Sequence, residues 1–157
     1  MSEFIFRSSW VIEGAPAPLF DALHAYTTWP EWWPGAERMT ELASARPDGT
    51  GGRGSYRWRS PIGYRIEFEG SATRVERPQW LAGTVEGDLR GSGTWQLSEL
   101  ADGTTRLDYL WQVTAERRAL RVLAPIVGPI LRSQHDRLMR AGAVGLAQRV
   151  GQRLVSS

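Results

Sequence analysis

Two side chains are candidates for moving or stabilising charge, and His135 is the first. On a helical wheel at about 100° per residue, His135 lies about 40° from Leu131, within the apolar face of a C-terminal helix. A neutral imidazole in an apolar pocket could orient a ligand or act as a general acid–base. The alternative is a buried histidine that forms a hydrogen bond with a backbone carbonyl or a tryptophan. The sequence leaves both interpretations open.

Arg74 is the second candidate. It shares strand parity with Tyr64, Ile66 and Phe68, so we expect its guanidinium to point inward and to stabilise an enolate. Gly70 precedes it, however, and a glycine inside a strand is typical of a β-bulge that shifts the register. A surface ion pair is therefore the alternative for Arg74.

Most of the candidate ligand-binding residues are aromatic. The chain of 157 residues has eight tryptophans, and large aromatics most often fill a core. Aromatic walls with a few polar tips are also what a pocket for a flat apolar ligand requires. We expect Trp29, Trp32 and Trp33 at the pocket mouth. The predicted ligand-binding residues are Trp32, Trp33, Tyr56, Trp58, Tyr64, Phe68, Trp95, Tyr109, Trp111, His135, Leu138 and Met139.

Composition excludes several classes of function. There is no cysteine, and the two histidines lack metal-ligand spacing with each other or with paired carboxylates, so no metal is expected. No glycine loop is suited to a phosphate, and no cofactor is predicted. The 19 basic residues, all arginine, are interleaved with 17 acidic ones, which argues against a nucleic-acid partner.

The remaining partner predictions concern membranes and self-association. The N-terminus does not resemble a signal peptide, and no apolar run approaches the roughly 20 residues that span a bilayer. We therefore expect a cytoplasmic protein without stable membrane insertion. The sequence is compatible with a monomer or with a homodimer paired through an exposed sheet edge.

The order of the predicted elements defines an α+β fold. A period-two strand from Phe4 to Glu13 precedes a helix that begins near Pro16. Thr28-Trp29-Pro30-Glu31 has the spacing of a capping box and predicts a second short helix that holds Trp32 and Trp33. Residues 36–115 alternate between strands and turns, and the rest is helical, with a kink or break expected at its prolines. We expect one domain over residues 1–157.

This order resembles the START-like, helix-grip superfamily, in particular its bacterial polyketide cyclase/dehydrase-type members. The matching segments are Ile12 to Pro16 with Leu19 to Leu23 and Trp29 to Pro34; Gly91 to Leu97 with Asp102 to Thr105; and Gln134 to Gly142. The resemblance covers nearly the whole chain. It implies a curved antiparallel sheet of about seven strands wrapped around a long C-terminal helix, with two short helices after the first strand.

Three functions remain open, because this fold does not define one activity. The first hypothesis is a carrier or binding module for a small hydrophobic molecule such as a lipid, quinone or polyketide. The second is an aromatic cyclase/dehydratase, without metal or nucleotide cofactor, that uses the same pocket. The third is a protein-interaction domain of the chaperone-activator kind with a filled core.

Overall fold

The fold combines one antiparallel sheet with a long C-terminal helix. The computed structural model describes residues 3–60 and 63–157, and within the last helix the side chains of residues 119–120 and 123–127 lie outside the description. The elements are β1 (Glu3–Glu13), α1 (Pro16–His24), the 3-10 helix η1 (Tyr26–Glu31), β2 (Ala36–Ala43), β3 (Arg53–Arg59), β4 (Arg65–Glu76), β5 (Trp80–Gly87), β6 (Leu89–Glu99), β7 (Thr104–Ala115), α2 (Arg118–Val150) and β8 (Leu154–Ser156).

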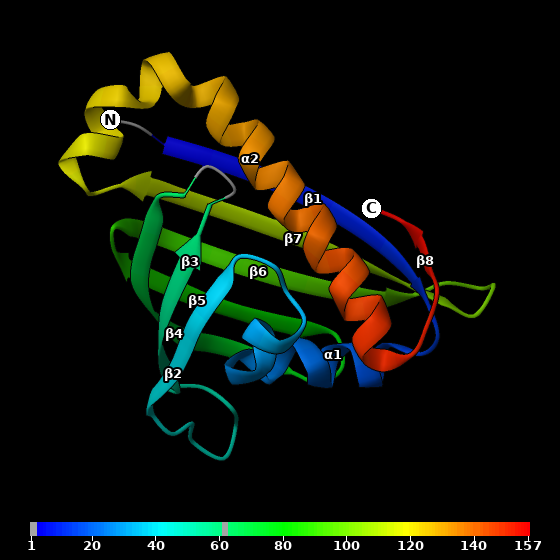
Figure 1. Ribbon diagram of the computed structural model, residues 1–157. Helices are drawn as coiled ribbons and strands as arrows, with labels where there is room; N and C mark the ends of the chain where they lie inside the picture. The colour runs from blue at the N-terminus through cyan, green and yellow to red at the C-terminus, as the bar shows by residue number, and fades with distance from the viewer. Residues whose placement is uncertain (1–2, 61–62) are drawn as a thin grey trace.

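Eight strands form the sheet in the order β2-β3-β4-β5-β6-β7-β1-β8. Figure 1 shows that the sheet curves, that α2 crosses its inner face and that α1 lies at one end. The predicted α+β helix-grip fold is confirmed. The sheet has one strand more than the seven expected, because the chain after α2 returns along β1 as β8.

Helix α2 presents the faces that the helical wheel predicts. Leu146 is fully buried, whereas Arg137 and Arg140 are exposed. The helix continues through its prolines, and Figure 1 shows that its first, yellow turns run in a different direction from the orange remainder. The expected break into two helices is therefore wrong, and the change of direction agrees with the expected kink.

The predicted capping box does not form. The Thr28 hydroxyl donates a hydrogen bond to the carbonyl oxygen of Ala25 at 2.7 Å instead of accepting one from Glu31. Glu31 is the last residue of η1, so Trp32 and Trp33 follow a short helix rather than lie inside one. Thr28 therefore lies inside the 3-10 helix and Glu31 at its end, with Pro30 between them.

The core has two parts. The larger cluster joins α1, the tryptophans after η1 and the last turns of α2 to strands β1, β6 and β7, with Trp10, Phe20 and Leu107 almost completely buried. The smaller cluster is centred on Phe68 and Val113. The large core fixes the C-terminal half of α2 against the sheet, and a cavity lies beside the small cluster.

Candidate functional site

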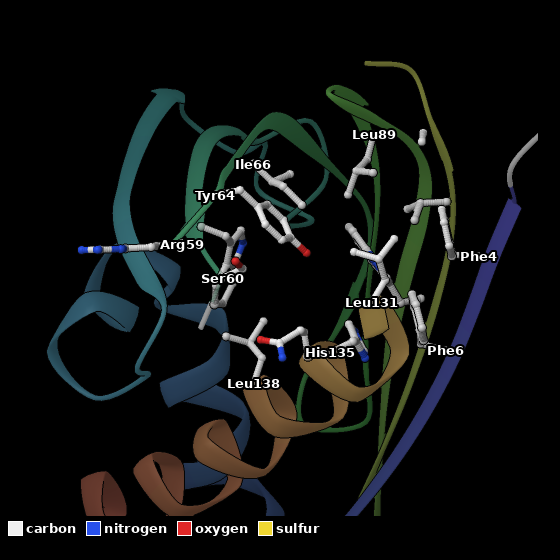
Figure 2. A pocket seen from close by; sticks show the side chains of 15 residues that line it. Phe4, Phe6, Arg59, Ser60, Tyr64, Ile66, Leu89, Leu131, His135 and Leu138 are labelled. Atoms are coloured by element: carbon white, nitrogen blue, oxygen red, sulfur yellow. The ribbon is translucent and has the colours of Figure 1, made fainter. Parts of the chain in front are cut away.

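The cavity lies between the middle of α2 and the strands that face it. It has a volume of about 110 Å³. Figure 2 shows the labelled side chains surrounding an open centre. The lining residues are Phe4, Phe6, Trp58, Arg59, Ser60, Tyr64, Ile66, Leu89, Trp111, Val113, Ala115, Leu131, Gln134, His135 and Leu138. Most of these side chains are apolar, so the cavity favours an apolar occupant.

Strand alternation explains why these side chains meet. Phe4 and Phe6 lie two residues apart on β1 and therefore share one face of the sheet. Residue Phe4 pairs with Val113 and Phe6 with Trp111 on the neighbouring strand β7. Successive apolar side chains on adjacent strands thus form one continuous wall of the cavity.

His135 lies where helix α2 meets this wall. Its ring stacks on that of Phe6, with the ring centroids 4.1 Å apart and the planes 15° from parallel. Burial lowers the pKa of His135 to about 4, and the carboxylate of Asp136 opposes the shift. The imidazole is therefore neutral at physiological pH. Its Nδ1 is buried and has no hydrogen-bond partner within the described part of the chain.

Two further polar groups come from the segment before β4. Figure 2 shows the Tyr64 hydroxyl pointing into the cavity. Burial raises the pKa of this tyrosine, and the nearby Ser60 hydroxyl partly offsets the rise. Ser60 Oγ is buried and forms no hydrogen bond of normal geometry in the described structure. Both hydroxyls are uncharged at neutral pH.

Five of the predicted ligand-binding residues line this cavity. They come from four segments of the chain, and the structure brings them together: Trp58, Tyr64, Trp111, His135 and Leu138. Whether each contacts a ligand remains a prediction.

The other predicted ligand-binding residues lie outside the lining. Tyr56 and Phe68 stack on each other at 5.3 Å, and Trp95 and Tyr109 stack at 4.3 Å. Met139, on α2, is buried in the large core. These aromatic residues pack behind the lining, so they support the shape of the cavity.

The predicted place of Trp32 and Trp33 at the cavity mouth is wrong. Only 8% of Trp32 and 3% of Trp33 is exposed, and neither lines the cavity. They pack against α2 where the helix has glycines: a Cβ on Gly142 would lie 2.4 Å from the Trp33 indole, and one on Gly145 would lie 1.8 Å from the Trp32 carbonyl oxygen. These two glycines allow the helix to approach the tryptophans closely.

The expectation that Arg74 points inward is also wrong. The pairing of β4 with β5 shifts between Ala72 and Arg74, and beyond this bulge Val75 packs on the core. Arg74 is exposed instead: its guanidinium pairs with Glu76 and lies 4.2 Å from the centroid of a Trp80 ring. The bulge predicted from Gly70 occurs a few residues later and reverses the parity on which the inward orientation depended.

Several lining residues were not predicted from the sequence as ligand contacts. Strand parity groups Phe4 with Phe6 and places Ile66 beside Tyr64, and the helical wheel places Leu131 beside His135. These periodic patterns are the sequence signal from which these lining residues could have been predicted. Leu89, Val113, Ala115 and Gln134 are also part of the lining.

The described residues offer little support for a metal site or a membrane span. No group of three or more histidine, cysteine, aspartate or glutamate side chains comes together among them. No described helix is both long enough and apolar enough to cross a membrane.

The chain belongs to a known family. Residues 3–151 match the model of the family described as "Polyketide cyclase / dehydrase and lipid transport". A comparison with curated protein sequences gives no match. The predicted membership in the polyketide cyclase/dehydrase family is confirmed.

Solved structures with the same fold include aromatase/cyclases and a START superfamily protein. The aromatase/cyclase ZhuI from Streptomyces sp. R1128 has a TM-score of 0.77 at 10% identity, with 96% of this chain and 94% of that one covered. A START superfamily protein from Mycobacterium smegmatis has a TM-score of 0.74 at 13% identity, with coverages of 94% and 97%.

A third similar structure is the di-domain aromatase/cyclase StfQ from the steffimycin biosynthetic pathway. The TM-score is 0.70 at 16% identity, and the match covers 95% of this chain. The present chain spans about half of that protein, since 52% of StfQ is covered. At these identities the likeness establishes the helix-grip fold and leaves the activity to be argued from the cavity.

Proposed function

We propose that the protein binds a small, largely apolar molecule in the cavity between the sheet and α2, as a binding module or carrier. The observation that supports this proposal is the cavity wall, in which aromatic and aliphatic side chains surround a few neutral polar groups. Transfer of apolar ligand surface from water into such a wall is favourable by about 25 cal/mol per Å². The family description, which includes lipid transport, is consistent with this function.

The size of the cavity limits the part of the ligand that it encloses. A volume of about 110 Å³ is on the scale of the roughly 150 Å³ apolar cavity that accepts benzene in another protein. We therefore propose that one ring-sized apolar group occupies the enclosed space. A longer ligand would extend out of the cavity.

A second candidate is an aromatic cyclase/dehydratase, which is favoured by the buried imidazole of His135 in the wall. An efficient general acid–base has a pKa near the working pH, however, and burial lowers the pKa of His135 to about 4. Arg74 lies outside the cavity and offers no enolate-stabilising charge there. Binding without turnover therefore fits the side chains better. A protein-interaction domain with a filled core fits less well, because the space beside α2 remains open.

Titration with toluene, followed by two-dimensional NMR of backbone and indole N–H groups, tests the proposal. We expect saturable shifts concentrated at Trp58, Trp111 and His135. Shifts that are absent, or spread evenly over the surface, would contradict binding in this cavity. Native mass spectrometry of the purified protein, with extraction of any bound molecule, would then identify the class of ligand.

A further inference from the structure

Two adjacent residues of α2 place buried polar atoms in the cavity wall without a partner. Gln134 Oε1 and His135 Nδ1 form no hydrogen bond with the described part of the chain, and both residues line the cavity. A buried polar atom without a partner destabilises a protein, because it loses its hydrogen bonds to water. Both side chains belong to the cavity lining, so a ligand group that forms hydrogen bonds with their polar ends gains affinity that a purely apolar ligand does not.

The two side chains offer hydrogen bonds of both kinds. A neutral imidazole has one N–H donor and one acceptor nitrogen, and an amide has an oxygen acceptor and an NH₂ donor. This holds whichever way the Gln134 amide is turned and whichever His135 nitrogen is protonated. Figure 2 shows the Tyr64 hydroxyl pointing into the same space from the opposite wall. A hydroxyl, which both donates and accepts, is the ligand group that matches this set.

The charge of the wall argues against an ionised ligand. Among the described lining residues Arg59 alone carries a full charge, and Figure 2 shows its guanidinium directed away from the cavity. Burial keeps His135 neutral by lowering its pKa. Arg132 lies over the Phe6 ring and Arg117 bonds the Arg65 carbonyl and Asp88, but neither belongs to the lining. A carboxylate enclosed here would therefore lose its hydration without a cation in the described lining to pair with, which is strongly unfavourable.

We propose that the ligand is an uncharged amphipathic molecule whose apolar body fills the cavity and whose hydroxyl group forms hydrogen bonds with Gln134 and His135. This inference rests on the proposed function and narrows its ligand class. Phenols and alcohols are favoured over hydrocarbons of the same shape and over free carboxylates such as fatty-acid anions.

Three probes of one shape test the inference at neutral pH: toluene, p-cresol and 4-methylbenzoate. A cavity without polar anchors prefers toluene, because the cresol hydroxyl must give up its hydrogen bonds to water. We expect p-cresol to bind the wild-type protein about tenfold more tightly than toluene, the value for one or two satisfied neutral hydrogen bonds. We expect 4-methylbenzoate to bind more weakly than either.

Variants test whether Gln134 and His135 cause the preference for p-cresol over toluene. In the double variant Gln134→Leu/His135→Phe we expect toluene to bind within about twofold of wild type, because the cavity keeps its shape, and p-cresol to lose its advantage. The matched control is Gln148→Leu/His24→Phe, since Gln148 is exposed on the same helix and His24 stacks on Phe20 at the end of α1. It should retain the wild-type preference.

The outcomes separate this inference from the proposed function. Toluene that binds as tightly as p-cresol, or a p-cresol preference that survives in the double variant, overturns the role of Gln134 and His135 while leaving the apolar cavity as a binding site. If none of the three probes binds, the proposed function fails together with the inference.

Discussion

The indole N–H of Trp33 donates a hydrogen bond to the backbone carbonyl oxygen of Leu138 at 3.0 Å. The bond links the segment after η1 to the middle of α2. Leu138 also lines the cavity, and Trp33 is buried behind it among five other tryptophan rings. The packing of the large core thus determines where the helical wall of the cavity lies.

Trp33→Phe tests this link. The variant loses the hydrogen bond to Leu138 and leaves space in the core, so we expect the free energy of unfolding to fall by about 2–4 kcal/mol. Denaturant unfolding provides the measurement. The control is Trp80→Phe, since Trp80 is only partly buried on β5, and it should cost about 1 kcal/mol or less. Equal, small losses in both variants would contradict the structural role of Trp33.

Replacement of helix glycines by alanine should have very different effects at two positions of α2. At Gly128 an added Cβ meets nothing within 4 Å apart from its chain neighbours, but Pro129 crowds the Cβ of a helical residue that precedes it, which offsets the better helix propensity of alanine. We therefore expect Gly128→Ala to change the free energy of unfolding by about 1 kcal/mol or less. At Gly145 the Cβ would lie 1.8 Å from the Trp32 carbonyl oxygen, so Gly145→Ala should be more strongly destabilising. Thermal unfolding of the two variants checks the difference in size, and equal, small changes would disprove the close approach of the helix.

The fold was predictable because its periodic patterns are simple. Alternation predicted β1, strands and turns were expected over residues 36–115, and the helical wheel predicted the inner face of α2 that carries Leu131 and His135. Arg74 was misplaced for a local reason: one extra residue in β4 reverses every later side chain. A bulge of this kind arises from the pairing with the neighbouring strand. The alternation of residues along one strand carries no information about that pairing.

The cavity was less predictable than the fold. The eight tryptophans share one chemistry, yet Trp58 and Trp111 line the cavity whereas Trp32 and Trp33 are buried against α2. Which tryptophan faces the cavity depends on how closely α2 approaches each strand. That distance is set by contacts between residues remote in sequence, such as Gly142 with Trp33.

Stability should depend on pH through His135. The imidazole has a pKa of about 6.5 in the unfolded chain and about 4 in the folded protein. Between these values the unfolded state binds more protons, so the free energy of unfolding is highest above about pH 6.5 and decreases as the pH falls. We expect His135→Phe to remove about 2 kcal/mol of the loss between about pH 7 and pH 4.5.

Denaturant unfolding of wild type and His135→Phe at the two pH values provides the measurement. The carboxylates titrate in both proteins, so the difference between the two proteins isolates the imidazole. Gln148→Leu is the control, because Gln148 is exposed on the same helix and does not titrate, and it should keep the wild-type pH dependence. Identical pH dependence in the His135→Phe variant and wild type would contradict the buried, neutral state of His135.

Arg74→Ala should leave the cavity unaffected. The arginine is exposed and its partners are Glu76 and Trp80, so we expect a loss of stability of about 1 kcal/mol or less. Toluene and p-cresol affinities should remain within about twofold of wild type. A loss of p-cresol affinity comparable to that in Gln134→Leu/His135→Phe would show that Arg74 contributes to the binding site.

Filling the cavity tests the central claim most directly. Ile66 lines the cavity from β4, whereas Ile5, on β1, is 36% exposed outside the lining. Ile66→Trp places a larger side chain in the space that the ligand would occupy, and Ile5→Trp makes the same change outside it. We expect calorimetry to show toluene affinity at least about tenfold lower in Ile66→Trp and unchanged in Ile5→Trp. Wild-type affinity in a folded Ile66→Trp variant would contradict binding in this cavity.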